Sequence, residues 1–195
     1  SMAGVFAAVD LNDGSAVGPV SATGHLAEAL VFDGVDDRVT VPNHASIDPL
    51  NGWTLSAWIK RSAPGVQHGV VEKFDWASGL GGYAMRIGSD NRLRGYVING
   101  VAYNACVGTT SLAAQTWYHV AVTFDPGSDT LRCYVNGVAE AVNAAATLTP
   151  IPSRTSLKIG ARGNDGGTPF AGSMDEVKIF ARSLSPAEVA AEAAR

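Results

Sequence analysis

The sequence predicts an all-β protein, built as a sandwich of two antiparallel sheets with a short C-terminal helix. Three observations predict this class. Apolar and polar residues alternate with a period of two in short runs along most of the chain. Turn-forming residues separate these runs at spacings of about ten residues, as in sandwich folds. The composition agrees, because 22 residues are glycine and aspartate supplies twelve of the 18 acidic residues.

The alternating runs identify the expected strands. They span 54–61, 82–88, 92–98, 117–124, 130–135 and 156–161. In the run "WYHVAVTF", Tyr118, Val120 and Phe124 fall on one side, while His119 and Ala121 fall on the other. One side of each such strand is expected to face the core.

Turn signals connect these strands. Asn99-Gly100 and Asn136-Gly137 each lie between strand-like residues and fit a two-residue hairpin turn that needs positive φ twice. The segments "GSDNR" at 88–92 and "DPGSD" at 125–129 predict two further chain reversals.

A helix is expected only at the C-terminal end. Ser185 is the predicted N-cap, Pro186 takes the first helical position and Glu188 the third, which completes a capping box before a run of helix formers.

Charge and hydropathy exclude several classes of partner. The net charge is -4 and the lysines and arginines form no cluster, so we expect no nucleic-acid partner. No segment approaches the roughly 18 apolar residues of a membrane span. The opening residues also lack the pattern of a signal peptide, and the leading Ser-Met is typical of a cloning remnant. We therefore expect residues 1–195 to be one domain cut from a longer protein.

The two cysteines, Cys106 and Cys133, allow two interpretations. A disulfide would close a loop of about 27 residues and stabilise the fold by roughly 3 to 4 kcal/mol. The favoured interpretation is a pair of buried free thiols in strands.

Several segments together resemble one family. They are 28–48 ("EALVFDGVDDRVTVPNHASID"), 53–61, 117–125, 131–138 and 157–189. In this order they resemble the laminin-G-like jelly-roll domain of the concanavalin A-like lectin and glucanase superfamily, from about Leu26 to Val189. The resemblance implies a curved two-sheet sandwich, with residues 1–195 as one such domain. It also implies an extracellular or cell-surface location, because such domains are usually appended to secreted enzymes or adhesins.

The stretch "FDGVDD" suggests a calcium site. The resemblance implies a structural calcium ion held by Asp175 and by a backbone carbonyl near Gly34, and calcium accepts such mixtures of oxygens. Asp33 and Asp36 are further candidate ligands, and Asp10 is the candidate from the N-terminal segment. The alternative is that Asp33, Asp36 and Asp37 hydrogen-bond their own turn, with Arg38 neutralising one of them.

Catalysis is not expected. The catalytic glucanases that the chain resembles carry acidic residues at alternating positions on one strand, and no such pair occurs here. Glu72 has Asp75 three positions later, which is the opposite face of a regular strand.

Sugar binding is the expected function. It needs an aromatic face and planar polar groups, and two loops with a neighbouring strand supply candidates. The candidate residues are His68, Asp75, Trp76, Arg94, Tyr103 and Asn104. For Trp76 the alternative is a loop residue folded back on the sandwich. The predicted function is a non-catalytic, calcium-stabilised module that binds a polysaccharide or glycan. The alternative is an adhesion domain for a surface protein, or a spacer that binds no sugar.

Overall fold

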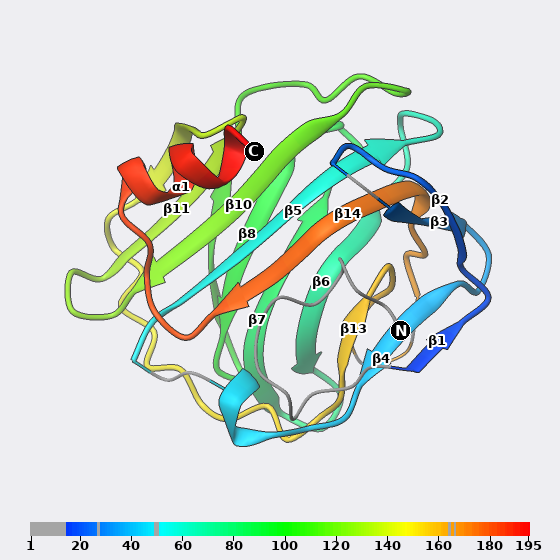
Figure 1. The fold of residues 1–195 in the computed structure, drawn as a ribbon. Coiled ribbons are helices and arrows are strands. Elements are labelled where there is room, and N and C mark those ends of the chain that lie inside the picture. Colours follow the sequence, from blue (N-terminus) through cyan, green and yellow to red (C-terminus); the bar gives the residue numbers. More distant parts are fainter. Residues whose placement is uncertain (1–14, 27, 49–50, 164, 166) are drawn as a thin grey trace.

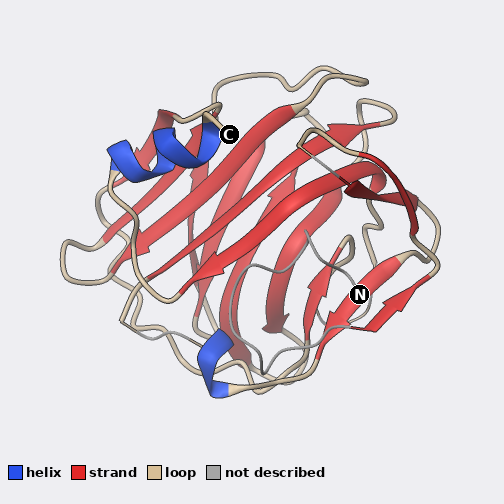
Figure 2. Cartoon of the chain, viewed as in Figure 1, coloured by secondary structure: helices blue, strands red, loops and turns tan. Residues whose placement is uncertain are grey.

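The computed structural model describes residues 15–195, except 27, 49–50, 164 and 166. Two antiparallel sheets of seven strands pack face to face (Figure 1), and strands dominate the fold (Figure 2). The predicted all-β jelly-roll sandwich is confirmed. Asp10 lies outside the described residues.

The two sheets are named A and B. Sheet A has the strand order β1 (Ser15–Val17), β4 (Arg38–Val41), β13 (Leu157–Ile159), β6 (His68–Asp75), β7 (Leu80–Ile87), β8 (Leu93–Ile98) and β9 (Tyr103–Val107). Sheet B has the order β12 (Val138–Asn143), β11 (Thr130–Val135), β10 (Tyr118–Asp125), β5 (Trp53–Arg61), β14 (Ala171–Phe180), β3 (Glu28–Asp33) and β2 (Val20–Thr23). A short 3₁₀ helix, η1 (Ala45–Ile47), precedes β5.

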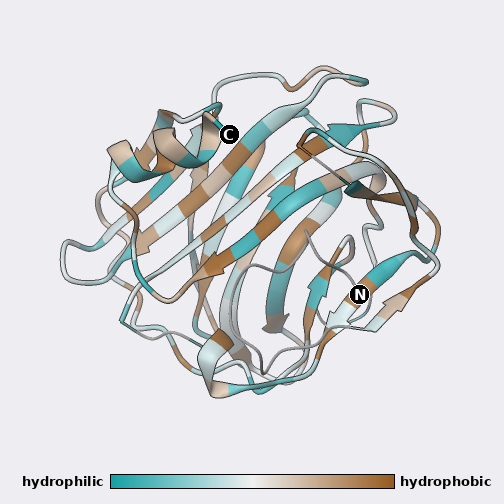
Figure 3. Ribbon diagram, in the orientation of Figure 1, coloured by the Kyte–Doolittle hydropathy of each residue, from teal (hydrophilic) through white to brown (hydrophobic). Residues whose placement is uncertain are grey.

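The main core lies between the sheets, and period-two alternation builds it (Figure 3). In β10, the side that faces this core is that of Val120, Val122 and Phe124. His119 and Ala121 on the other side of β10 are also buried. The strand is therefore covered on both faces.

Helix α1 (Pro186–Ala193) covers part of the outward face of sheet B and forms as predicted. The Ser185 hydroxyl accepts the N–H of Glu188, and the Glu188 carboxylate accepts the N–H of Ser185 at 2.8 Å. Val189 and Leu184 pack on Ala121 and Tyr134 of sheet B. The cap thus starts the helix where its apolar side meets the sheet.

The two Asn-Gly turns have different outcomes. Asn136 and Gly137 have φ of 49° and 78° and join the paired residues Val135 and Val138, which confirms a two-residue turn. The prediction for Asn99-Gly100 was wrong, because Ile98 pairs with Tyr103 and the loop has four residues. The Asn99 side chain accepts the N–H groups of Val101 and Ala102, which stabilises the longer loop.

The two cysteines form a disulfide, so the free-thiol interpretation was wrong. Cys106 lies on β9 of sheet A and Cys133 on β11 of sheet B, with Cα atoms 5.9 Å apart. Both side chains point into the core from facing sheets. Alternation within one strand cannot show this, because it carries no information about which residues of the other sheet lie opposite.

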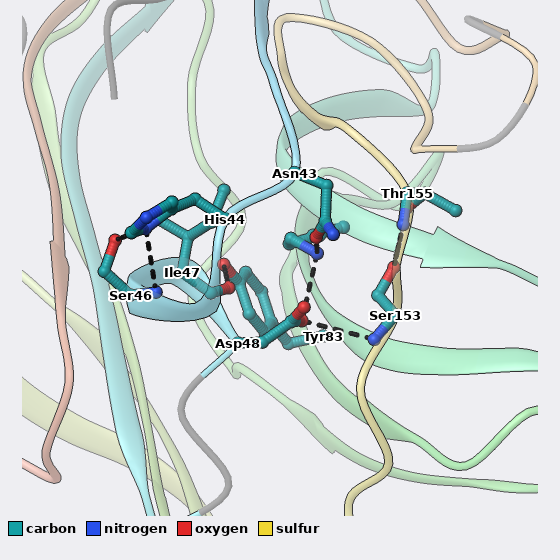
Figure 4. A network of polar contacts seen from close by, with 9 residues as sticks. Asn43, His44, Ser46, Ile47, Asp48, Tyr83, Ser153 and Thr155 are labelled. Atoms are coloured by element: carbon teal, nitrogen blue, oxygen red, sulfur yellow. Dashed lines mark hydrogen bonds and ion pairs between the residues drawn. The ribbon is translucent and has the colours of Figure 1, made fainter. Parts of the chain in front are cut away.

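A polar network fastens the β4–β5 connection and the segment before β13 to the sandwich (Figure 4). Lys73 of β6 is fully buried and donates to Asn43 Oδ1 at 2.8 Å and to Asp48 Oδ1 at 2.9 Å. Asp48 also accepts the N–H of Ser153 at 3.2 Å, and the Tyr83 hydroxyl donates to the Ile47 carbonyl at 2.8 Å. One buried cation thus organises two loops at this end of the sandwich.

Candidate functional site

A pocket of about 430 Å³ opens on the outward face of sheet A. It is formed by strands β6 to β9, by the β6–β7 turn and by the loop after β13. Its lining consists of Phe74, Trp76, Ala77, Arg86, Tyr96, Ile98, Tyr103 and Arg162. This set is called the aromatic pocket below. Its volume lies within the range usual for small-ligand sites.

The floor of the aromatic pocket is a small apolar cluster separate from the main core. Phe74, Ala84 and Ile98 form this cluster, with Tyr96 packed against it. These residues alternate with core-facing ones such as Tyr83 and Val97, so period-two geometry places them on the outward face. The result is a rigid apolar base.

Two aromatic side chains rise from this base. Trp76 begins the β6–β7 turn and is 44% exposed, while Tyr103 begins β9 and is 57% exposed. Their ring centroids lie 6.3 Å apart at 65°, and Tyr103 meets Tyr96 at 5.5 Å and 71°. Mutual edge-to-face contacts therefore hold these rings while leaving surface open to a ligand.

Arg86 is the fixed cation of the aromatic pocket. Its guanidinium carbon lies 5.1 Å from the centre of the Tyr96 ring and 5.7 Å from that of Phe74. Its Nη2 donates to Glu72 Oε2 at 2.9 Å. Two rings and a carboxylate thus set the orientation of this side chain.

Glu72 lies buried behind Arg86. Burial raises the pKa of its carboxyl group, while the nearby Arg86 charge and the N–H of Gly163 oppose that rise. Gly163 donates to Oε2 at 3.3 Å, and Oε1 has no hydrogen-bond partner among the described residues. Glu72 therefore orients Arg86 and fastens the loop after β13 without lining the pocket.

Arg162 comes from that fastened loop. The Arg162 N–H donates to the carbonyl of Gly167, and its Nη1 pairs with Asp165 Oδ2 at 3.2 Å. Both side chains are well exposed, at 34% and 51%, so this ion pair is weak. Arg162 is the more accessible of the two pocket cations.

The structure brings together two of the six predicted sugar-site residues, Trp76 and Tyr103. The placement of His68 was wrong, because His68 is 2% exposed and its Nδ1 meets the carbonyl of Pro169 at 2.9 Å. It begins β6, whereas Trp76 follows the end of that strand. Asp75 lies beside Trp76, but its Oδ1 accepts the N–H of Ser78 and shapes the turn.

Arg94 and Asn104 also lie outside the pocket lining. Arg94 shares the outward face but donates to both oxygens of Asp90, at 2.7 and 3.0 Å. Asn104 accepts the N–H of Leu148 at 3.2 Å. It alternates with Tyr103 along β9, so its side chain leaves on the opposite face. A role of these two residues in sugar binding stays a prediction.

Sequence reasoning missed Phe74, Arg86, Tyr96 and Arg162. The first three carried a signal: Phe74 is two residues before Trp76, and Tyr96 is two after Arg94, so each shares a face with a predicted site residue. Arg86 could have been found by pairing β7 with β8, which sets it opposite Arg94. Arg162 carried no such signal, because only the folded loop after β13 brings it to the sheet.

The aspartate turn forms a compact cluster. Ligand oxygens of Asp33, Asp36 and Asp37 lie within 4.8 Å of one another. The same carboxylates stabilise the turn, since Asp33 Oδ1 accepts the N–H of Val35 at 2.7 Å and Asp37 Oδ2 accepts that of Asp33 at 2.7 Å. Gly34 has a φ of 83°, a conformation that favours glycine. Arg38 donates to the carbonyl of Asp36 rather than neutralising a carboxylate in this turn.

Asp175 does not join this cluster. Ala171 is the residue of β14 opposite Asp33, so Asp175 lies four residues farther along the strand, about 13 Å at strand spacing. Its Oδ2 accepts the N–H groups of His25 and Leu26, each at 2.9 Å, and its Oδ1 accepts that of Glu176 at 2.8 Å. Asp175 therefore holds the β2–β3 connection against sheet B, and the predicted combination of Asp175 with Gly34 and Asp33 is wrong.

These features define a jelly-roll sandwich of concanavalin A type with a pocket on one sheet. The chain belongs to the Concanavalin A-like lectin/glucanases superfamily, because a laminin G family model of that description matches residues 33–190. No curated protein matches the chain in sequence.

Solved structures share the fold. The binding domain of Paraclostridial Mosquitocidal Protein 1 is 15% identical with a TM-score of 0.76, over 93% of this chain and 47% of that chain. The binding domain of botulinum neurotoxin DC in complex with SialylT is 16% identical with a TM-score of 0.69, over 94% and 46%. The same domain with rat synaptotagmin II is 15% identical with a TM-score of 0.70, over 94% and 46%.

At these identities the likeness establishes the fold alone. The chain spans just under half the length of those solved chains. Within the described residues, no helix is long and apolar enough to cross a membrane.

Proposed function

We propose that the chain is a non-catalytic carbohydrate-binding module and that the aromatic pocket is its site. The observation that carries this proposal is the pair of exposed rings, Trp76 and Tyr103, above an apolar base. Sugar rings present a C–H face that packs on aromatic surfaces and a rim of hydroxyls that needs directed polar groups. The two aromatic rings offer a surface for the C–H face, and Arg86 and Arg162 offer hydrogen-bond donors for the hydroxyls.

The structural neighbours support a binding role. One of them was solved in complex with SialylT, and another belongs to botulinum neurotoxin type C, whose cell entry is dependent upon interaction with two ganglioside molecules. Both are proteins of which the chain matches less than half. They make a glycan a reasonable ligand to test, and the pocket supplies the physical argument.

The lining also supports a role without catalysis. A retaining glycosidase holds two carboxyl groups about 5 to 5.5 Å apart across its substrate. None of the residues that line the pocket carries a carboxylate. Of the nearby carboxylates, Glu72 is buried and paired with Arg86, and Asp165 is paired with Arg162. Such a pocket can hold a sugar without the groups that cleave it.

A glycan-array screen of the purified domain tests the proposal, with Trp76→Ala alongside. We expect the wild type to bind one class of glycan and the variant to lose at least tenfold in affinity, because one stacking ring is removed. Val35→Ala is the matched control, since it also removes an exposed apolar side chain, but in the aspartate turn. Binding that survives in Trp76→Ala, or no binding by the folded wild type, would refute the proposal.

Protein recognition is a second candidate. Strand β12 lies at the edge of sheet B, and its Val138 and Val142 are 66% and 54% exposed. A free edge with apolar side chains is suited to adding a strand from another protein. A neighbour that was solved in complex with rat synaptotagmin II is in keeping with this use of the fold.

We also propose a calcium site, at the turn of Asp33, Asp36 and Asp37. These carboxylates are close enough to share one ion, although two of their oxygens already accept backbone N–H groups. Melting curves with calcium and with a chelator test it. A rise in melting temperature that Asp36→Asn abolishes would support the site, and identical curves would exclude it.

We further propose that the domain works outside the cell or on its surface. The Cys106–Cys133 disulfide supports this location, because such bonds persist in oxidising compartments.

A further inference from the structure

We infer that the aromatic pocket selects acidic saccharides, those that carry a carboxylate or a sulfate group. This inference rests on the proposed function and specifies the ligand class of the same site. It is carried by the two guanidinium groups in the lining, Arg86 and Arg162.

Arg86 is oriented before any ligand arrives. Glu72 holds Nη2, and the rings of Phe74 and Tyr96 flank the guanidinium. Its Nη1 donates to none of the described residues. An arginine fixed in this way loses little conformational entropy when it donates to an anion.

Arg162 supplies a positive charge whose acidic partner a ligand can replace. Its only acidic partner among the described residues is Asp165, which is 51% exposed. Because an exposed ion pair contributes little, Asp165 can turn to water while a ligand carboxylate or sulfate takes its place. Arginine suits that exchange, since its planar fork matches the two oxygens of a carboxylate.

The two arginines line the aromatic pocket, while their acidic partners do not. Glu72 pairs with Arg86 but is fully buried behind it, and Asp165 pairs with Arg162 from outside the lining. The chain as a whole carries -4, so an acidic saccharide would be repelled from most of the surface. The two arginines thus form a part of the surface that attracts an acidic saccharide.

Matched glycan pairs test the inference. Each pair contains an acidic oligosaccharide and its neutral counterpart: sialylated and desialylated, uronate and carboxyl-reduced, sulfated and desulfated. The affinities of the wild type are compared with those of Arg162→Gln, which removes the positive charge but keeps a polar side chain with hydrogen-bond donors. Arg132→Gln is the control, because Arg132 lies on β11 of the other sheet.

We expect the wild type to prefer the acidic member of at least one pair by tenfold or more. Arg162→Gln should lose most of that preference and keep the weaker binding of the neutral member, while Arg132→Gln behaves as wild type. Equal or tighter binding of the neutral members, or a preference that survives in Arg162→Gln, would overturn the inference and leave the proposed function intact. If the wild type binds neither member of any pair, both fail together.

Discussion

At the residue scale, buried charged side chains position much of the sandwich. Arg61, Glu72 and Lys73 are almost without exposure. Lys73 and Glu72 each have an oppositely charged partner, whereas Arg61 donates to Asn91 Oδ1 and to the carbonyl of Leu112. Removing one partner of such a pair costs more than the pair contributes, because an uncompensated charge stays in the protein.

The Lys73–Asp48 pair gives the first stability prediction. Asp48→Asn should lower the free energy of unfolding by about 3 kcal/mol, the lower end of the range for breaking a buried pair, because Asp48 is partly exposed. Urea denaturation measures the change.

The double variant Lys73→Met with Asp48→Asn is the control. It removes the buried charge together with its partner, so it should be more stable than Asp48→Asn alone. A single variant that unfolds at the wild-type urea concentration would contradict this account of the network.

His119 gives a prediction for pH. Burial lowers the pKa of this imidazole to about 4 from the ordinary value of 6.5, and its Nε2 meets Ser56 Oγ at 2.9 Å. Since the folded state takes up the proton less readily than the unfolded state, the stabilising contribution is complete above pH 6.5. It is lost as the pH falls towards 4, by up to about 3 kcal/mol.

Chemical denaturation at pH 7.5, 6 and 4.5 measures this loss. The variant His119→Gln should show a shallower decline than the wild type, whereas His44→Gln should not, because His44 is exposed. Equal slopes for all three proteins would show that another group controls acid stability.

At the element scale, the disulfide joins an edge strand of one sheet to the other sheet. Strand β9 pairs only with β8 within sheet A, and Cys106 connects it to β11 of sheet B. The bond closes a loop with a sequence separation of 27 residues. Replacing both cysteines by serine should therefore reduce the free energy of unfolding by about 3 to 4 kcal/mol.

Guanidinium denaturation of the double serine variant measures this effect, and reduction of the wild type provides an independent comparison. Because the bond joins the edge strand β9 to sheet B, hydrogen exchange at β9, which carries Tyr103, should also accelerate in the variant. Unchanged stability in both measurements would contradict a structural role for the bond.

Elements also differ in how far the sequence could predict them. The β11–β12 turn and helix α1 were predictable, because Asn136-Gly137 and Ser185-Pro186 act through the local backbone. The β8–β9 loop was not, because the hydrogen bonds that the Asn99 side chain accepts from Val101 and Ala102 favour four residues over two. The Cys106–Cys133 bond depends on the packing of two sheets, which strand alternation does not encode.

At the scale of the whole molecule, the candidate site was predictable only in part. Trp76 and Tyr103 could be proposed from their places beside turns, and the structure brings them together. His68 and Asp175 were misplaced, because a polar residue in a strand can bond to distant backbone, as they do with Pro169 and with His25. Such long-range partners come from the packed fold.

The central claim is that the aromatic pocket is where a sugar binds. The most direct test titrates the labelled domain with the best glycan from the array and follows amide, indole and guanidinium resonances by NMR. We predict that the largest changes in chemical shift occur at the Trp76 indole, at Tyr103 and at Arg162. The indole resonances of the buried Trp53 and Trp58 should not shift. Shifts gathered instead along β12 or over the aspartate turn would contradict the claim.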